Sequence, residues 1–421
     1  MPRRNPGLPC SLSWSSPPSN DSTKLSWMQA FGVFVVSLLA ACDSGAARGK
    51  EPTGWPEVWP APLHHRPEVR WSVAPDPELE IGSERDGGPI FHRLGDVLTL
   101  EDGSILVVDR GDVRIHRFAP DGSHLTGLGR MGFGPGEFRT IGGVLPLDSG
   151  SFLVFDPGIP RLTTMSLTGE VLDTRRIEVP PGLGGSLGAT RLTEPPGSDL
   201  LLLVPQGVVI RARPTPETFL EEIPIFAYDR RGSLIGPFGP VWRMEMWGDR
   251  RGSGPIPFGR RSIAWTGQDG LYLGDTQGGL IEVWGGKGQL LRVVDLQATP
   301  VSVTRGFQDA WIMDRIQGIT DREARARYRS WLSQIPFPDH LPFFDEMAIA
   351  RDGWIWIRQA SVPGLAMHAL WTVLSADGAP MAEIELPLQL QIQEIHADRI
   401  VGIWTDSLGV QTVRSYSLAR E

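Results

Sequence analysis

Asparagine and lysine are scarce in this 421-residue chain, and each scarcity excludes a class of function. Asparagine occurs only at Asn5 and Asn20, so sites that depend on Asn side chains are excluded from the rest of the chain. Lysine occurs only at Lys24, Lys50 and Lys287, so arginine carries nearly all of the positive charge. The net charge is −9 and there is no basic block, which argues against nucleic acid as a partner.

Cysteine is equally rare, and its placement is informative. Only Cys10 and Cys42 occur, which excludes a disulfide framework in the folded body. Cys42 follows an apolar run that begins at Trp27 and ends in Leu39-Ala40-Ala41. This run is too short to cross a bilayer as a stable helix, and it matches the hydrophobic region of a secretory signal.

Residues 1–41 closely resemble a bacterial lipoprotein signal peptide with its lipobox, whether translation begins at Met1 or Met28. The resemblance implies cleavage before Cys42 and lipid attachment to its thiol. The body would then be anchored to a membrane of the bacterial cell envelope, in the periplasm or outside. The alternative is an uncleaved apolar stub with an unrelated cysteine. Residues 42–68 are rich in Gly, Pro and Ala and predict a flexible tether.

From residue 91 the sequence repeats a pattern of apolar strands and acidic-Gly turns. In the clearest copy, strands at 96–100 and 105–109 flank the turn Glu101-Asp102-Gly103. Asp-Gly between alternating apolar runs is a strong hairpin signal. In the next copy the matching strand ends at Asp156, and 156 − 109 = 47 residues is the length of one propeller blade.

Six such copies can be traced, and four align closely on their turn glycines, Gly103, Gly150, Gly270 and Gly353. Twelve residues before each glycine stands a large apolar residue, which we interpret as a repeated packing position: Phe91, Phe138, Phe258 and Leu341. The sixth copy ends after its third strand. Residues 69–81 have a strand-like pattern and would supply the missing outer strand, so that no sheet edge is left open.

The segment Gly129 to Phe138 resembles the inter-blade loop of NHL-type repeats. The chain from about residue 70 resembles the exported six-bladed propeller lipoproteins of bacteria, which implies an all-β, six-bladed β-propeller over 69–421. We expect one interruption, a helical hairpin at 308–336. Its second helix would begin at a capping box formed by Thr320 and Glu323 and would stop at Pro336.

Ligands of propellers usually bind where the loops leading into the innermost strands converge. By register with the turn glycines, these lead-in loops carry His92, Arg93, Arg139, Arg260, Arg261, Asp345 and Glu346. Arginines can hold an anionic ligand through bidentate pairs. The alternative is that they brace neighbouring blades against those carboxylates. Arg322, Arg325 and Arg329 form a stripe on the inserted helix that suits an acidic partner or lipid headgroups, or a plain solvated face.

Catalytic patterns of related propellers are missing. Lactonase-type calcium sites rely on Asn, and the repeated Ser-x-Asp-x-Gly turns of sialidases do not occur. Only His92 and His340 fall in comparable lead-in loops, which is too few for zinc, and no Gly-x-Ser-x-Gly motif stands out. We therefore predict no metal and no cofactor, and we can name no catalytic residue.

The sequence favours a monomeric, non-catalytic binding or scaffold protein of the envelope. Its channel mouth and inserted helices would engage a protein, a peptide or a small anionic ligand. A hydrolase or lyase with a degenerate channel site is the alternative.

Overall fold

The structure, a computed structural model, describes residues 67–82, 88–147, 150–180, 190–208, 212–362 and 368–420. The expected signal peptide 1–41, Cys42 and nearly all of the tether lie outside these residues. The regular secondary structure of the described part is almost all β-strand, with two helices. Neither helix is long and apolar enough to cross a membrane.

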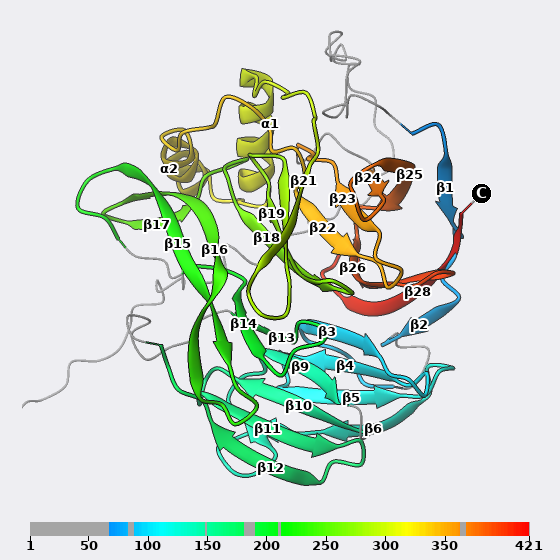
Figure 1. Ribbon diagram of the computed structural model, residues 1–421. Coiled ribbons are helices and arrows are strands. Elements are labelled where there is room, and N and C mark those ends of the chain that lie inside the picture. The colour runs from blue at the N-terminus through cyan, green and yellow to red at the C-terminus, as the bar shows by residue number, and fades with distance from the viewer. Residues whose placement is uncertain are drawn as a thin grey trace, which may run out of the picture.

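Four antiparallel sheets follow one another along the chain (Figure 1). The first holds β3 (Leu94–Thr99), β4 (Ile105–Asp109), β5 (Arg114–Phe118) and β6 (His124–Leu128). A small parallel pair, β7 (Arg130–Met131) and β8 (Glu137–Phe138), leads to the second sheet. The second holds β9 (Gly143–Leu147), β10 (Ser151–Asp156), β11 (Arg161–Ser166) and β12 (Val171–Arg176).

The third sheet is larger than the others, and the fourth again has four strands. The third holds β13 (Thr190–Thr193), β14 (Leu201–Pro205), β15 (Glu217–Tyr228), β16 (Leu234–Asp249) and β17 (Gly252–Pro255). The fourth holds β18 (Ser262–Gly267), β19 (Gly270–Asp275), β20 (Leu280–Trp284) and β21 (Leu290–Asp295).

The last sheet has nine strands and includes both ends of the described chain. Its strands are β22 (Glu346–Ile349), β23 (Ile355–Arg358), β24 (His368–Leu374), β25 (Pro380–Pro387), β26 (Leu390–Ile395), β27 (Arg399–Thr405), β28 (Gln411–Ala419), β1 (Arg70–Val73) and β2 (Leu79–Ile81). β2 pairs with β28, so the N-terminal segment does supply an outer strand. β1 pairs in parallel with β25 and antiparallel with β28, and it thereby joins two four-stranded units.

Trp71 of β1 fixes this joint. Its ring stacks on Trp354 at 5.2 Å between centroids, and the guanidinium of Arg420 lies over both rings. Trp71 is also buried in a hydrophobic cluster with residues of both units. The two ends of the described chain are therefore held together by aromatic packing as well as by backbone pairing.

The turn glycines behave as their sequence predicts. Gly103 has φ +79°, a conformation that residues with a Cβ rarely adopt. At Gly270 a Cβ would collide with the carbonyl oxygen of Trp284. The repeated apolar position is buried at Phe91, Phe138 and Leu341, and Phe258 is partly buried.

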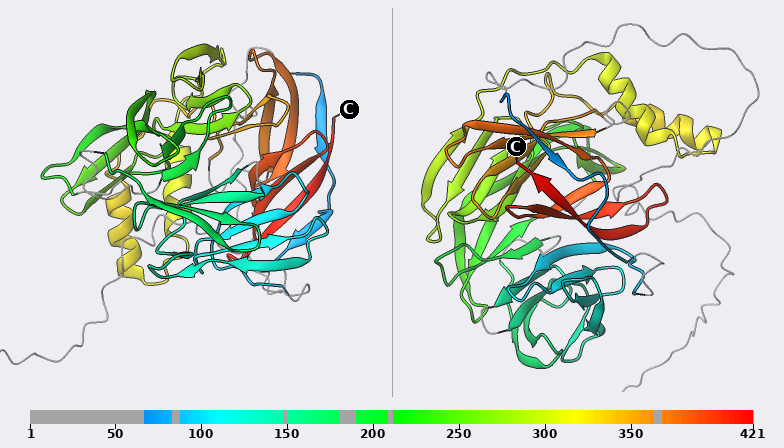
Figure 2. Two further views of the ribbon diagram at one scale, coloured as in Figure 1. Left: turned by 60° about the horizontal axis from the view of Figure 1, so that its bottom comes forward. Right: turned by 90° about the vertical axis from the view of Figure 1, so that its right-hand side faces the viewer.

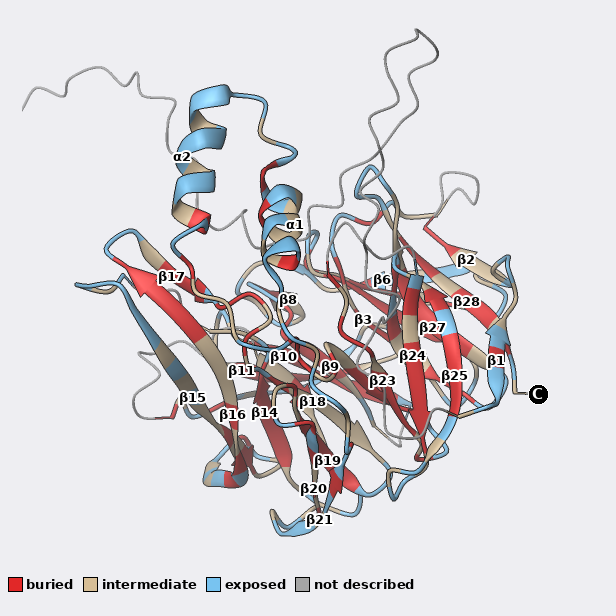
Figure 3. Ribbon diagram, turned by 90° about the horizontal axis from the view of Figure 1, so that it is seen from above, coloured by how far each residue is buried: buried red, intermediate tan, exposed pale blue. Residues whose placement is uncertain are grey.

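The core lies between adjacent sheets. The second strand of each sheet is almost completely buried, as in β10 and β14 (Figure 3). Residues from two neighbouring sheets share most of the sheet clusters: Val108 and Ile115 of the first sheet, for example, pack with Phe152 and Val154 of the second.

Six strands surround the centre of the molecule: β3, β9, β13, β18, β22 and β26 (Figure 1). Side chains join strands that are far apart in sequence. The hydroxyls of Thr193 and Thr266 lie 2.6 Å apart and connect β13 to β18. The backbone N–H of Thr99 in β3 donates to Glu394 of β26 at 3.0 Å, which links the first of these strands to the last.

Two helices, α1 (Arg305–Ile316) and α2 (Arg322–Leu332), lie between β21 and β22 and project from the sheets (Figure 2). α1 begins at Arg305, three residues before the expected 308, because Thr304 caps it. The residue that caps α2 is Asp321 and not the expected Thr320. The backbone of Asp321 is extended, and its carboxylate accepts from the N–H of Ala324 at 2.6 Å.

The helices have a small core of their own with the third sheet. Ile312, Ile316 and Leu332 pack against Trp247 of β16 and Ile256, which follows β17. The β15–β16 hairpin is the longest in the described residues. The end of this hairpin that is remote from its turn extends past the rest of the sheet and packs against the helices.

Candidate functional site

The lead-in loops of the first two sheets are held by buried aspartates at the ends of β4 and β10. The carboxylate of Asp109 accepts from the backbone N–H groups of His92 at 2.8 Å and Arg93 at 3.0 Å. Asp156 accepts in the same way from Arg139 at 2.8 Å. Burial alone would raise the pKa of Asp109, but the backbone hydrogen bonds outweigh it and lower that pKa. The backbones are therefore fixed, while the side chains of His92, Arg93 and Arg139 stay exposed.

The lead-in loop of the fourth sheet is anchored by different groups. The backbone N–H of Arg260 donates to Glu245 at 3.1 Å, and its guanidinium lies 3.4 Å from Asp275. The Arg261 guanidinium donates to the carbonyl oxygen of Asp345, in the loop that leads into β22. Both arginines thus contact neighbouring groups, in line with a bracing role, yet they keep exposed surface.

Asp345 and Glu346 share one arginine. Nε of Arg358 lies 2.5 Å from Asp345, and its NH1 lies 2.8 Å from Glu346. Burial raises the pKa of Glu346, although Arg358 opposes the shift. Burial disfavours the charge on Arg358, but Asp345 and Glu346 together raise its pKa. The three groups carry one net negative charge when both carboxylates are ionised.

Arg260, Arg261 and Asp345 line a cavity of about 330 Å³ between the lead-in loops and the two helices. We call it the lead-in cleft. The helices contribute Trp311, Arg315, Tyr328 and Trp331, and β16 contributes Glu245. The structure therefore brings three of the seven predicted site residues together. His92, Arg93, Arg139 and Glu346 do not line this cleft.

The aromatic side chains of the cleft pack against one another. Tyr328 stacks on Trp331 at 5.6 Å with 18° between the ring planes, and Trp331 meets Trp247 edge-on at 5.9 Å. The Arg315 guanidinium lies 5.2 Å from the ring centre of Trp311. Burial raises the pKa of Tyr328. The cleft thus offers rigid apolar faces beside guanidinium groups.

Arginines outnumber carboxylates in the lining of the cleft. Three arginines and two carboxylates, Glu245 and Asp345, line the cleft, an excess of one positive charge. On α2, Arg325 donates to the carbonyl oxygens of Ile319 at 2.7 Å and Gln317 at 3.3 Å, so it holds the two helices together. Arg322 and Arg329, from the same predicted stripe, remain exposed.

The sequence signal for the aromatic wall was present but ambiguous. Tyr328 and Trp331 stand three residues apart in the sequence of the expected second helix, a spacing that indicates packing as readily as binding. Glu245 gave no signal, because the length of β16 was not expected. Within the described ranges no cluster of three or more His, Cys, Asp or Glu residues is arranged to hold a metal ion.

No protein-family model matches the sequence, and no curated protein matches it. Among solved structures, a DUF4221 family member from Bacteroides vulgatus aligns with a TM-score of 0.50 and 11% identity, over 84% of this chain and 99% of that one. A predicted exported protein from Bacteroides fragilis gives 0.46 and 8%, over 85% and 98%. Virginiamycin B lyase from Staphylococcus aureus gives 0.40 and 11%, over 83% and 99%. The DUF4221 likeness shows the fold: the chain is a β-propeller-like protein.

Proposed function

We propose that this chain is a lipid-anchored envelope protein whose body, residues 69–421, is a single six-bladed β-propeller with NHL-like repeats. The four-stranded units β3–β6, β9–β12, β18–β21 and β22–β25 support this reading, as do β13–β16 and β26–β28 with β2. The helices are then an insertion between the fourth and fifth blades. The anchor at Cys42 rests on the lipobox-like sequence before it.

The proposed function is non-catalytic binding of an acidic segment of another envelope protein in the lead-in cleft. The observation that carries it is the lining of the cleft, where three arginines stand beside stacked aromatic rings. Guanidinium groups recognise carboxylates in bidentate pairs. Tyr, Trp and Arg are the residues that dominate binding energy at protein interfaces.

The carboxylates of the cleft are already engaged. Asp345 is held by Arg358, and Glu245 accepts from the backbone of Arg260. The exposed Arg322 and Arg329 extend the positive surface along α2, which suits a chain segment longer than the cleft itself.

A hydrolase or lyase remains the second candidate, favoured by one observation. The raised pKa of Glu346, one residue from the cleft, is typical of a general acid or base. If the chain is an enzyme, Glu346→Gln should abolish turnover and leave substrate affinity unchanged. If it is a binding protein, the same substitution should leave its affinity for the partner unchanged.

Photo-crosslinking in intact cells tests the binding function. Tyr328→p-benzoylphenylalanine in the full-length chain is expected to give one discrete crosslinked protein. Arg260→Glu should abolish that product, and Lys287→Glu, an equal charge change on an exposed turn, should not. The same probe at Leu172, which is 53% exposed on β12, serves as the position control. Identical products from Tyr328 and Leu172 would contradict the proposal.

A further inference from the structure

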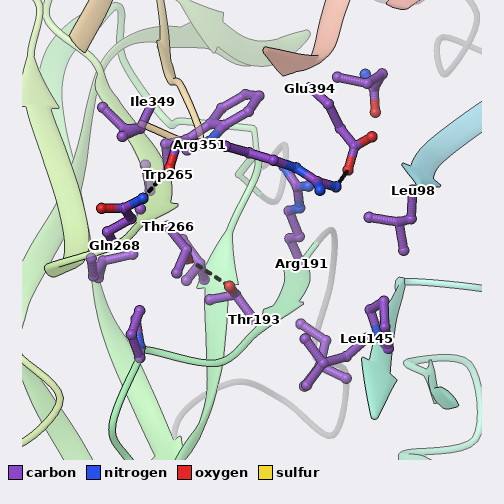
Figure 4. A pocket seen from close by; sticks show the side chains of 18 of the residues that line it. Leu98, Leu145, Arg191, Thr193, Trp265, Thr266, Gln268, Ile349, Arg351 and Glu394 are labelled. Carbon is purple, nitrogen blue, oxygen red and sulfur yellow. Dashed lines mark hydrogen bonds and ion pairs between the residues drawn. The ribbon is translucent and has the colours of Figure 1, made fainter. Parts of the chain in front are cut away.

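A second cavity, of about 470 Å³, lies at the centre of the ring of innermost strands (Figure 4). We call it the central cavity. All six strands line it, through residues such as Leu98, Leu145, Arg191, Trp265, Ile349 and Glu394. Gln268 and Arg351, in the turns that follow β18 and β22, also line it. Each innermost strand has a lead-in loop at one end and a turn at the other. The central cavity therefore opens at the end that carries the turns.

Arg191 is the least engaged charged group in this cavity. Its Nε lies 3.8 Å from Asp96, and its guanidinium lies 5.6 Å from the ring centre of Trp265. It makes no side-chain hydrogen bond to any residue that the structure describes, and 31% of the side chain is exposed. A guanidinium has five N–H donors, so Arg191 presents unused donors to the cavity (Figure 4).

Asp96 is placed beside Arg191 by a β-bulge. The register of β3 against β4 shifts between Leu94 and Val97, which inserts one extra residue. Bulges re-aim side chains and are frequent next to functional sites. The Asp96 side chain is only 8% exposed, yet its Oδ2 has no hydrogen-bond partner among the described residues. Its charge is balanced by Arg191 and by Arg110, whose NH2 lies 3.6 Å away.

At the other pole of the cavity the two charged groups, Arg351 and Glu394, pair with each other. Arg351 donates to Glu394 at 2.8 Å and to the carbonyl oxygen of Thr99 at 3.1 Å. Burial opposes ionisation of Glu394, but hydrogen bonds from His396 and Thr99 and the charge of Arg351 outweigh it and lower the pKa. Glu394 is thus an anion that holds Arg351 in place. Counting Arg110, three arginines face two carboxylates, an excess of one positive charge.

The remaining wall is largely apolar, and several of its polar groups are bonded to one another. Leu98, Leu145 and Ile349 are aliphatic, and Trp265 presents a partly exposed ring. Thr193 and Thr266 bond to each other, and the Gln268 amide donates to the carbonyl oxygen of Arg351. Of the charged residues among the described ones that line the cavity, Arg191 is the one whose side chain makes no hydrogen bond, whereas Arg351 and Glu394 are bonded to each other.

We propose that the central cavity binds a small organic carboxylate with an apolar body. The carboxylate pairs with Arg191, and the body lies against Trp265 and the aliphatic wall. A monoanion matches the single excess positive charge better than phosphate, whose second charge would lack a counterion. Two guanidiniums within 4 Å of Asp96 also exclude a cation at that carboxylate. This site is separate from the lead-in cleft and does not rest on the function proposed for it.

The test is isothermal titration of the full-length chain, in a non-ionic detergent, with 2-naphthoate and with neutral 2-naphthylmethanol. Naphthoate should bind with one molecule per chain. The alcohol should bind with an affinity at least roughly tenfold lower, as expected for the loss of one charge-assisted hydrogen bond. Arg191→Gln should weaken naphthoate by the same factor. Arg315→Gln, in the lead-in cleft, should leave it unchanged, so failure of one site is distinguishable from failure of the other.

Two further variants keep the proposal falsifiable if Arg191→Gln folds poorly. Arg191→Lys keeps the charge but loses the planar fork, and should bind naphthoate with intermediate affinity. Asp96→Asn removes the carboxylate that competes with the ligand for Arg191, so it should increase the affinity for naphthoate. If Arg191 had only a structural role, this substitution would not increase that affinity. No naphthoate binding, equal binding by Arg191→Gln, or no gain in a folded Asp96→Asn protein would each overturn the proposal.

Discussion

Replacing Asp109 by asparagine removes the charge that holds the first lead-in loop to its sheet. The carboxylate accepts four backbone N–H groups: His92 at 2.8 Å on Oδ2, and Arg93 at 3.0 Å, Gly111 at 2.8 Å and Asp112 at 3.3 Å on Oδ1. An amide can present only one oxygen to these donors. The variant therefore loses the bond from His92 and turns three charge-assisted bonds into neutral ones.

The expected cost follows from these contacts. A hydrogen bond to a charged group contributes about 1.5–3 kcal/mol, and a neutral one about 1 kcal/mol. Losing one charged bond and weakening three others destabilises the fold by about 3 kcal/mol or more. The folded-state pKa of Asp109 is lowered from its ordinary value of 3.8. Its stabilisation is therefore present above that value and lost as the pH falls through the folded-state pKa, so the difference between wild type and variant should narrow in acid.

Urea unfolding followed by tryptophan fluorescence measures this difference. Asp121→Asn is the matched control, because Asp121 is exposed and caps a turn through Ser123 alone. Its cost should stay within about 1 kcal/mol. If Asp109→Asn destabilised the chain no more than Asp121→Asn, the strand-ending aspartates would not be the anchors of the lead-in loops.

Three other outcomes are expected. Cys42→Ser should abolish incorporation of labelled palmitate in cells, and continued labelling would refute the lipid anchor. Burial, with the charges of His124 and Arg114, lowers the pKa of His116 to about 4. The unfolded state therefore takes up a proton at a higher pH than the folded state, and the free energy of unfolding falls as the pH drops from 6.5 toward 4. His116→Leu should reduce this pH dependence in urea unfolding, and an unchanged slope would contradict the reasoning. Trp71→Ala should lower the free energy of unfolding by about 3–5 kcal/mol in thermal or urea unfolding, because it leaves a cavity where the two ends of the described chain pack together. Leu408→Ala, at a residue that is 75% exposed, should change the free energy of unfolding little.

Local chemistry made the regular sheets predictable. Asp-Gly turns require the positive φ that Gly103 and Gly353 adopt, and the alternating apolar strands between them bury one set of residues. The outer strand from the N-terminal segment followed from counting strands in the last repeat. The wedge of β1 between β25 and β28 could not be foreseen, because it depends on Trp71 meeting Trp354 from the far end of the chain.

The sequence indicated the third sheet only as a looser repeat, and the length of its β15–β16 hairpin escaped prediction for a local reason. Pro224 argues against a strand, yet it lies in β15 where the register shifts, and such an irregularity tolerates a residue without an N–H group. The long hairpin that results carries Glu245 and Trp247 to the lead-in cleft. Local pattern contains no information about that contact with α2.

The sites were partly predictable. Register with the turn glycines identified Arg260, Arg261 and Asp345, which line one cleft. It could not separate them from Arg93 and Arg139, whose loops lead into other sheets. Arg191 was missed because its strand, β13, belongs to the least regular repeat and has four residues. Its importance comes from Asp96 and Trp265, which only the closed ring of strands brings near it.

The affinity of the partner captured through Tyr328 tests the central claim most directly. Its binding to the full-length chain is measured across a range of NaCl concentrations for Arg260→Glu, Arg315→Glu and the control Lys287→Glu. Both cleft variants should weaken binding roughly tenfold or more and reduce its salt dependence, while the control leaves both unchanged. Equal affinities for all three variants would contradict recognition of an acidic segment by the lead-in cleft.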